Sequence, residues 1–224
     1  MLHPWARHDL ERRTMLNAIG PVWDGNEVWL VTGGGALFAA FPLVYATLFS
    51  GFYIPFMLAL TALILRAVSI EFRSKQTSRL WRQVWDGGFF AGSLLASLLL
   101  GVLVGNLAWG IPLDNTYQYA GGFWNLLHPY ALLVGLTTVA LFLMHGAIYL
   151  VMKTEGEFHD QVREWTRNAM IFFIICYALT TMATLLFVPR MATPFRDHPW
   201  WGIIAVINML AIANIPREIF HKRD

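Results

Sequence analysis

Between Val28 and Leu65 the chain runs for 38 residues without an aspartate, glutamate, lysine or arginine. As a single helix this run would be ~57 Å long at ~1.5 Å per residue, almost twice the ~30 Å hydrocarbon thickness of a bilayer. The run therefore has to fold back on itself, and we expect a membrane hairpin. Asp24 and Glu27 lie immediately before it, so the hairpin has carboxylates at its mouth.

The remaining sequence also indicates a membrane protein. Hydrophobic residues make up 57% of the 224 residues and charged residues only 13%, which is too little polar surface to cover a soluble domain. Further uncharged stretches can each cross a bilayer. We therefore predict an all-α, polytopic transmembrane helix bundle that forms one domain, 1–224. Its six spans are expected at about 29–49, 51–71, 87–108, 128–152, 168–189 and 199–216, with the first turn near Ser50-Gly51.

The basic residues predict the orientation of these spans. Six crossings place fourteen of the sixteen lysines and arginines on one side, and only Arg190 and Arg196 on the other. By the positive-inside rule the side rich in basic residues is cytoplasmic, so both ends of the chain are predicted to be cytoplasmic. Segment 72–86 sets Trp81 and Trp85 among arginines, which is typical of a short interfacial helix at the headgroup level.

Several kinds of chemistry are excluded by the composition. Cys176 is the only cysteine, so an internal disulfide, a thiolate zinc site and a haem attached through two cysteines are excluded. No phosphate-binding glycine loop, His/Cys metal cluster or nucleophilic triad has a recognisable spacing. We expect no metal site, no catalytic residue and no nucleic-acid partner on this chain.

Ionisable groups near membrane depth are the main functional candidates, because burying a charge there costs at least ~2.5–3.5 kcal/mol. Asp24 and Glu27 lie between Trp23 and Trp29 at the start of the first span. An acid in the first turn of a helix is also favoured by the helix dipole, so capping and proton handling both remain open.

Other polar residues favour structural roles. His128 and His145 are separated by ~25 Å of helix and cannot ligate the two faces of one haem. We expect His145 to be a buried histidine bonded to a neighbouring helix, and Asn106 to be a buried amide that bonds across helices. Small residues at a period of four predict close helix packing, against either an internal neighbour or a partner subunit, at Gly88, Gly92, Gly101 and Gly105.

The segment Gly20–Pro42, with the sequence GPVWDGNEVWLVTGGGALFAAFP, resembles the signature of subunit II of cytochrome bd-type quinol oxidases. The resemblance covers most of residues 11–155. Membership of the cyanide-insensitive branch of the same family is an alternative. Further matching motifs are FSGFY at 49–53, EFRSK at 71–75, GN at 105–106, GIP at 110–112 and HGA at 145–147.

The resemblance implies a function. Family members are non-haem subunits of a respiratory quinol:oxygen oxidoreductase in the bacterial inner membrane, and they pack against a subunit I that holds haem b, haem d and the quinol site. The implied roles are a proton pathway for Asp24 and Glu27 and an oxygen path for Trp29 and Trp23. Subunit packing by the four glycines is a prediction from their spacing alone. A quinone or a lipid is the expected additional bound molecule, and no cofactor is expected on this chain directly.

Family members have nine helices whereas six spans are predicted here, so the resemblance implies a chain truncated at both ends. Two other interpretations remain open. The chain could be a stand-alone membrane transporter, with Asp24, Glu27, Asn106 and His145 along its pathway, although no internal repeat of the transporter kind is present. It could also be an inactive fragment.

Overall fold

We describe the chain from a computed structural model, which describes the backbone of residues 1–220 and the side chains of residues 1–217. Residues 221–224, which contribute to the predicted orientation of the C-terminal end, lie outside the described residues. Throughout the described part, the regular elements are helices, which confirms the predicted all-α class. The chain consists of two compact units, Met1–Val139 and the part that begins at Ala140. The boundary between them falls within the helix α6 (Pro129–Val151).

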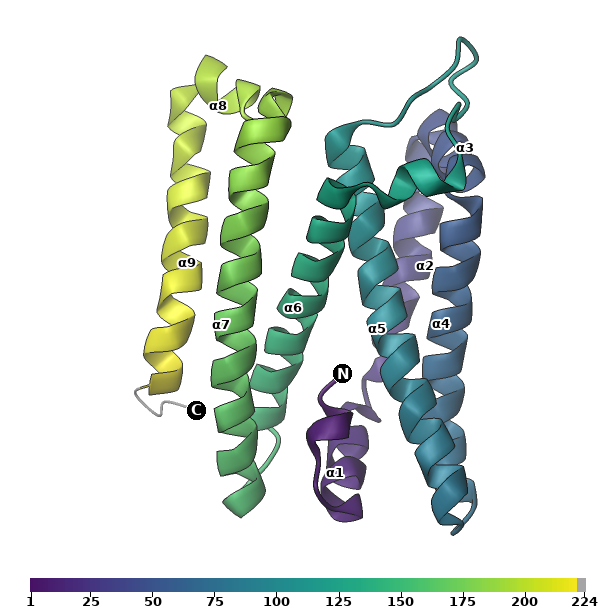
Figure 1. Cartoon of the computed structure of the whole chain (residues 1–224), viewed down its shortest axis with the longest axis vertical. Coiled ribbons are helices and arrows are strands. Elements are labelled where there is room, and N and C mark those ends of the chain that lie inside the picture. The colour runs from purple at the N-terminus through teal and green to yellow at the C-terminus, as the bar shows by residue number, and fades with distance from the viewer. Residues whose placement is uncertain (221–224) are drawn as a thin grey trace. The chain divides into compact units, whose positions relative to one another are not determined.

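The first unit is built on an antiparallel pair, α4 and α5, which lie side by side (Figure 1). The α2 and α3 helices precede this pair, and a short α1 lies near the N-terminus. The unit contains α1 (Asp9–Ile19), α2 (Trp23–Ala40), α3 (Pro42–Gly51), α4 (Tyr53–Phe72), α5 (Arg79–Trp109) and the part of α6 up to Val139.

The first predicted span, 29–49, is divided between two helices. Phe41 separates α2 from α3 with φ −137° and ψ 61°, outside the helical region. Proline at position 42 has no N–H to donate to the carbonyl four residues earlier, so the helix bends there. The turn predicted near Ser50-Gly51 is present, because α3 ends at Gly51 and α4 begins at Tyr53.

The short interfacial helix predicted near 72–86 is not a separate element. This segment contains the end of α4, a 3₁₀ turn at Arg73–Lys75 and the beginning of α5, which continues without a break to Trp109. The Trp81 indole N–H donates to the carbonyl of Phe72 at 2.8 Å and so closes the turn between the two helices. Both predicted interfacial tryptophans therefore lie on the first turns of a long helix.

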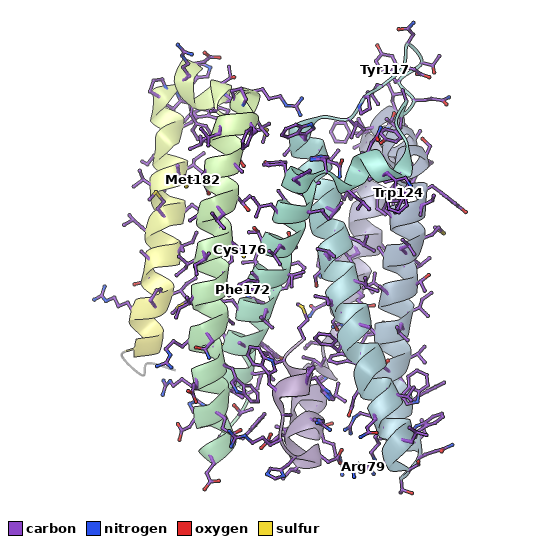
Figure 2. All side chains as sticks on the ribbon, in the orientation of Figure 1. Arg79, Tyr117, Trp124, Phe172, Cys176 and Met182 are labelled. Carbon is purple, nitrogen blue, oxygen red and sulfur yellow. The ribbon has the colours of Figure 1, made fainter. Side chains whose placement is uncertain are left out.

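The loop between α5 and α6 covers one end of the first unit, and Figure 2 shows Tyr117 and Trp124 on it. Phe52 and Leu126 are almost completely buried in one cluster with Leu48. The Thr47 hydroxyl is 2.8 Å from the carbonyl of Tyr117, so α3 is hydrogen-bonded to this loop. The loop is thus fixed on the ends of the helices by apolar packing and by hydrogen bonds.

The second unit contains the later part of α6 together with α7 (Gly156–Phe187), α8 (Thr193–Asp197) and α9 (Gly202–Phe220). Its core is a cluster of Ala140, Met144, Ala169, Met170, Phe173 and Cys176. The α9 helix lies against α7 (Figure 1), where the Asn208 amide donates to the Tyr177 hydroxyl at 2.6 Å.

Five helical segments in the described residues are long and apolar enough to cross a membrane: Tyr53–Lys75, Arg79–Trp109, Pro129–Val151, Gly156–Phe187 and Pro199–Arg217. These correspond to the second to sixth predicted spans. The first is absent from this set because α3 has only 10 residues and because α2, with Asp24, Asn26 and Glu27 in its 18 residues, is not apolar enough on average. The polytopic character of the fold is confirmed, with the first span broken in two.

Candidate functional site at the start of α2

The acidic pair predicted from the sequence lies in the first two turns of α2. Asp24 is in the first turn and is exposed, and among the described residues it has no hydrogen-bond or ion-pair partner. The positive end of the helix dipole favours a carboxylate at this position. Trp23, beside it, is half-buried. The Asp24 carboxylate is therefore open to the surroundings of the chain.

Glu27 lies three residues later and is bound within the chain. Its carboxylate forms an ion pair with the guanidinium of Arg66 on α4, and their side chains are 23% and 22% exposed. The Arg66 guanidinium carbon is also 6.0 Å from the centre of the Phe89 ring on α5, within the range of a cation–π interaction. The structure thus brings Glu27 together with an arginine that the sequence placed only among the basic residues of the cytoplasmic side.

Trp29, predicted on an oxygen path, is 74% exposed on α2. Val31 lies on nearly the opposite face of the helix and is 76% exposed, so α2 presents apolar surface outward on more than one face. Hydrocarbon tails and an apolar partner are both compatible with that surface. The roles of Trp23 and Trp29 stay predictions.

The four glycines predicted to mediate packing all face other helices of this chain. A Cβ atom on Gly92 would lie 2.5 Å from the carbonyl oxygen of Ala62, and one on Gly88 would lie 2.7 Å from the Ser69 hydroxyl, both on α4. Gly101 and Gly105 face α6 in the same way. The sequence left open whether these glycines pack against an internal helix or a partner subunit. In the structure an internal helix, α4 or α6, lies against each of them. A role in subunit packing stays a prediction.

Asn106 and His145, both predicted to be buried, differ in the structure. Asn106 is 3% exposed, and its amide donates to the carbonyls of Val102 at 2.9 Å and Leu126 at 2.7 Å. It therefore joins α5 to the loop. The prediction for His145 is wrong, because this side chain is exposed. Met144 faces the core of the second unit, and the next residue of a helix points about 100° away from it.

A network of charged side chains around Arg73 was missed by the sequence analysis. Arg73 is buried and donates two hydrogen bonds to Asp86 on α5, one from Nε and one from an Nη atom at 3.2 Å. It also donates to Asp9 on α1 at 2.7 Å. Arg82 also donates to Asp9, at 3.0 Å. The hydrogen bond from Arg73 lowers the pKa of Asp9 below its usual 3.8. Arg73 and Asp86 lie in the stretch of charged residues between two spans, but their pairing with α1 has no local sequence signal.

No group of three or more His, Cys, Asp or Glu side chains that could hold a metal ion occurs in the described part of the chain. Cys176 on α7, the single cysteine of the sequence, has a buried side chain (Figure 2). The candidate site therefore consists of the exposed Asp24, the Glu27–Arg66 pair and the indoles of Trp23 and Trp29. These groups can accept, donate and hold protons or a charge, and the indoles provide apolar surface.

Comparison with known proteins places the chain in a family. A family model described as cytochrome bd terminal oxidase subunit II matches residues 1–224. The chain is 46% identical over 178 residues to cytochrome bd-I ubiquinol oxidase subunit 2 of Escherichia coli strain K12, a match that covers 78% of this chain and 47% of that protein. It is 40% identical over 179 residues to cytochrome bd ubiquinol oxidase subunit 2 of Bacillus subtilis, covering 80% of this chain and 53% of that protein.

A third relative, named probable cytochrome oxidase subunit 2, is from Haemophilus influenzae and is 45% identical over 178 residues, or 78% of this chain and 47% of that protein. The chain spans about half the length of the curated relatives it matches. Because the family model matches the chain from its first residue to its last, the chain belongs to the cytochrome bd terminal oxidase subunit II family.

Proposed function

We propose that the chain is a non-haem membrane subunit of a respiratory quinol:oxygen oxidoreductase. The observation that carries this proposal is the family match over residues 1–224, together with relatives that are named as subunit 2 of ubiquinol oxidases. The five apolar helices support an integral position in the membrane. The family match also favours an oxidase subunit over the stand-alone transporter.

The proposed partner is a subunit I that binds the quinol and carries haem b and haem d. Those haems would supply electron transfer and the reduction of oxygen, and this chain would bind none directly. The outward apolar surfaces of α2 are compatible with such a partner, with lipid, or with a bound quinone. We further propose the bacterial cytoplasmic membrane as the location, with both ends of the chain on the cytoplasmic side.

The proposed contribution of this chain to the reaction is access. Reduction of oxygen to water consumes protons, and Asp24 is an exposed carboxylate without a partner in the described residues. We assign the proton transfer to Asp24, which accepts and releases the proton, and a supporting part at the same corner of the chain to Glu27. Trp29 and Trp23 would border the path of the apolar oxygen molecule beside it.

The experiment is an Asp24→Asn substitution in the assembled oxidase, with oxygen consumption measured per haem. Asparagine has nearly the same shape but cannot carry a proton, and removal of a general acid–base group lowers turnover by about 10²–10⁴-fold. The control is Asp197→Asn on α8, an exposed carboxylate outside the proposed route. Normal assembly with unchanged turnover in Asp24→Asn would refute the proton route.

A simpler measurement tests the assignment to an oxidase. Tagged chain is purified from membranes in mild detergent, and the absorbance spectrum of the eluate is recorded. Haem bands in the eluate support a subunit of an oxidase. A colourless protein from cells that produce the haem-bearing subunit would contradict the proposal.

A further inference from the structure

The α2 helix, which carries the proposed proton-accepting residue, is weakly held by apolar packing. None of its residues is buried. A Cβ atom added to Gly33, Gly34 or Gly35 would meet no other atom within 4 Å, so open space lies beside the middle of the helix. The apolar contacts of α2 lie toward its end, where Leu37 packs against the Leu48, Phe52 and Leu126 cluster and the Phe38 ring lies 5.1 Å from that of Tyr45 on α3. Apolar packing therefore does little to fix the first turns of α2.

One polar contact ties this helix to the rest of the unit. In the part of the chain that the structure describes, the Glu27–Arg66 ion pair is the sole side-chain hydrogen bond or ion pair between α2 and another helix. The other side-chain hydrogen bond on α2 stays within the helix, from the Thr32 hydroxyl to the carbonyl of Val28 at 3.0 Å. The connection between α2 and α4 thus depends on one carboxylate.

The arginine at the other end of this contact is itself well fixed. Gly92 lets α5 approach so closely that a Cβ atom there would lie 2.9 Å from the Arg66 backbone nitrogen and 3.2 Å from its Cβ atom. The guanidinium also lies over the Phe89 ring. Arg66 therefore belongs to the α4–α5 pair, the most extensively packed pair of helices in the first unit.

Glu27 lies three residues after Asp24, less than one helical turn. The backbone positions of the two residues are therefore only ~4.5 Å apart along the axis of α2. Any movement of Glu27 relative to Arg66 therefore moves Asp24 as well. We propose that Glu27 is a positioning residue: its contact with Arg66 sets the place of Asp24 relative to α4 and α5. This inference rests on the proposed function, and it refines that function by stating how Glu27 supports Asp24 without carrying a proton itself.

The two roles of Glu27 predict different outcomes for two substitutions. In Glu27→Gln the amide oxygen can still accept the hydrogen bond from Arg66, but the side chain cannot carry a proton. In Glu27→Leu the volume is similar and the acceptor is lost. For a positioning residue, Glu27→Gln retains the turnover of the parent oxidase, whereas Glu27→Leu loses up to ~10²-fold, the effect of a displacement of about 1 Å.

Turnover is measured as oxygen consumption per haem in the assembled oxidase, with the pH profile recorded for each variant. A loss in Glu27→Gln as large as that in Glu27→Leu would show that Glu27 carries protons and would overturn the proposal. Parent turnover in both variants would overturn it as well. Asp24→Asn, measured in parallel, tests the proposed function separately, because its loss of turnover does not depend on Glu27.

A distance measurement on the purified chain needs no oxidase activity. Spin labels are attached to cysteines at Val31 on α2 and Leu60 on α4, both exposed, in a Cys176→Ala background. The expected distance distribution is unchanged in Glu27→Gln and is broader or longer in Glu27→Leu. An unchanged distribution in Glu27→Leu would show that the ion pair does not hold α2, even if Glu27→Leu fails to assemble with a partner.

Discussion

The close approach of α4 and α5 predicts a large cost for one added methyl group at Gly92. A Cβ atom at this position would lie 2.5 Å from the carbonyl oxygen of Ala62 and 2.9 Å from the backbone nitrogen of Arg66. Real Cβ atoms essentially never approach closer than 3.0 Å, so the two helices have to separate by at least 0.5 Å. Both clashing atoms belong to the backbone, which means that no side-chain rotation can relieve the contact.

The magnitude for Gly92→Ala follows from two opposing terms. Overpacking of a tightly packed interior costs about 1–3 kcal/mol, and two backbone contacts place this site near the upper end. Alanine is also better than glycine in a helix by about 1 kcal/mol. The net expectation is a loss of about 2 kcal/mol in the free energy of unfolding.

Gly87→Ala, on the same helix, is the matched control. A Cβ atom at Gly87 would meet nothing within 4 Å, so this variant keeps the gain in helix propensity without the clash. We expect the two variants to differ by about 2–3 kcal/mol, with Gly87→Ala at or above the parent. Unfolding of the purified chain in mixed micelles, followed by tryptophan fluorescence, measures the difference. Equal stability of the two variants would refute the packing argument.

Two further predictions concern the polar contacts. Asn106→Leu removes the donor to the buried carbonyl of Leu126, and an unpaired buried group costs about 1–3 kcal/mol, so thermal unfolding should begin earlier and the α5–α6 loop should be cleaved faster by protease. Because the hydrogen bond from Arg73 lowers the pKa of Asp9 below 3.8, its contribution to stability is present above that pH and is lost as the pH falls through the lower value in the folded chain. Asp9→Asn should therefore be less stable than the parent at neutral pH, and unfolding curves recorded between pH 7 and pH 3 should show this difference shrinking below about 3.8. A difference that is constant over this range would contradict the ion-pair explanation.

The helix content and the turns of this chain follow well from hydropathy and breaker residues. The turn near Ser50-Gly51 was predicted because glycine and serine interrupt a long apolar run. The lengths of α5 and α7 were underestimated, since the search for spans stops at the first charged residue. Arginine, glutamate and glutamine are good helix formers, so both helices continue into their charged ends.

Contacts between distant segments could not be predicted in the same way. Glu27 and Arg66 are 39 residues apart, and nothing in the sequence gives the register of α2 against α4. Burial of His145 was predicted because ionisable groups in membrane helices usually face the interior. Which face of α6 is interior depends on packing with α7, where Met144 takes the inward position. The acidic pair itself was found because its place before an uncharged run is a local feature.

The length of α5 has a consequence for the membranes in which this chain can reside. Its 31 residues correspond to ~46 Å, while the uncharged part from Gly87 to Trp109 corresponds to ~34 Å. That uncharged part slightly exceeds an average hydrocarbon thickness of ~30 Å, and the charged turns before it extend into water. A bilayer that is a few ångströms thicker or thinner can therefore be accommodated by a small tilt or a vertical shift of the helix, with its first turns remaining hydrated.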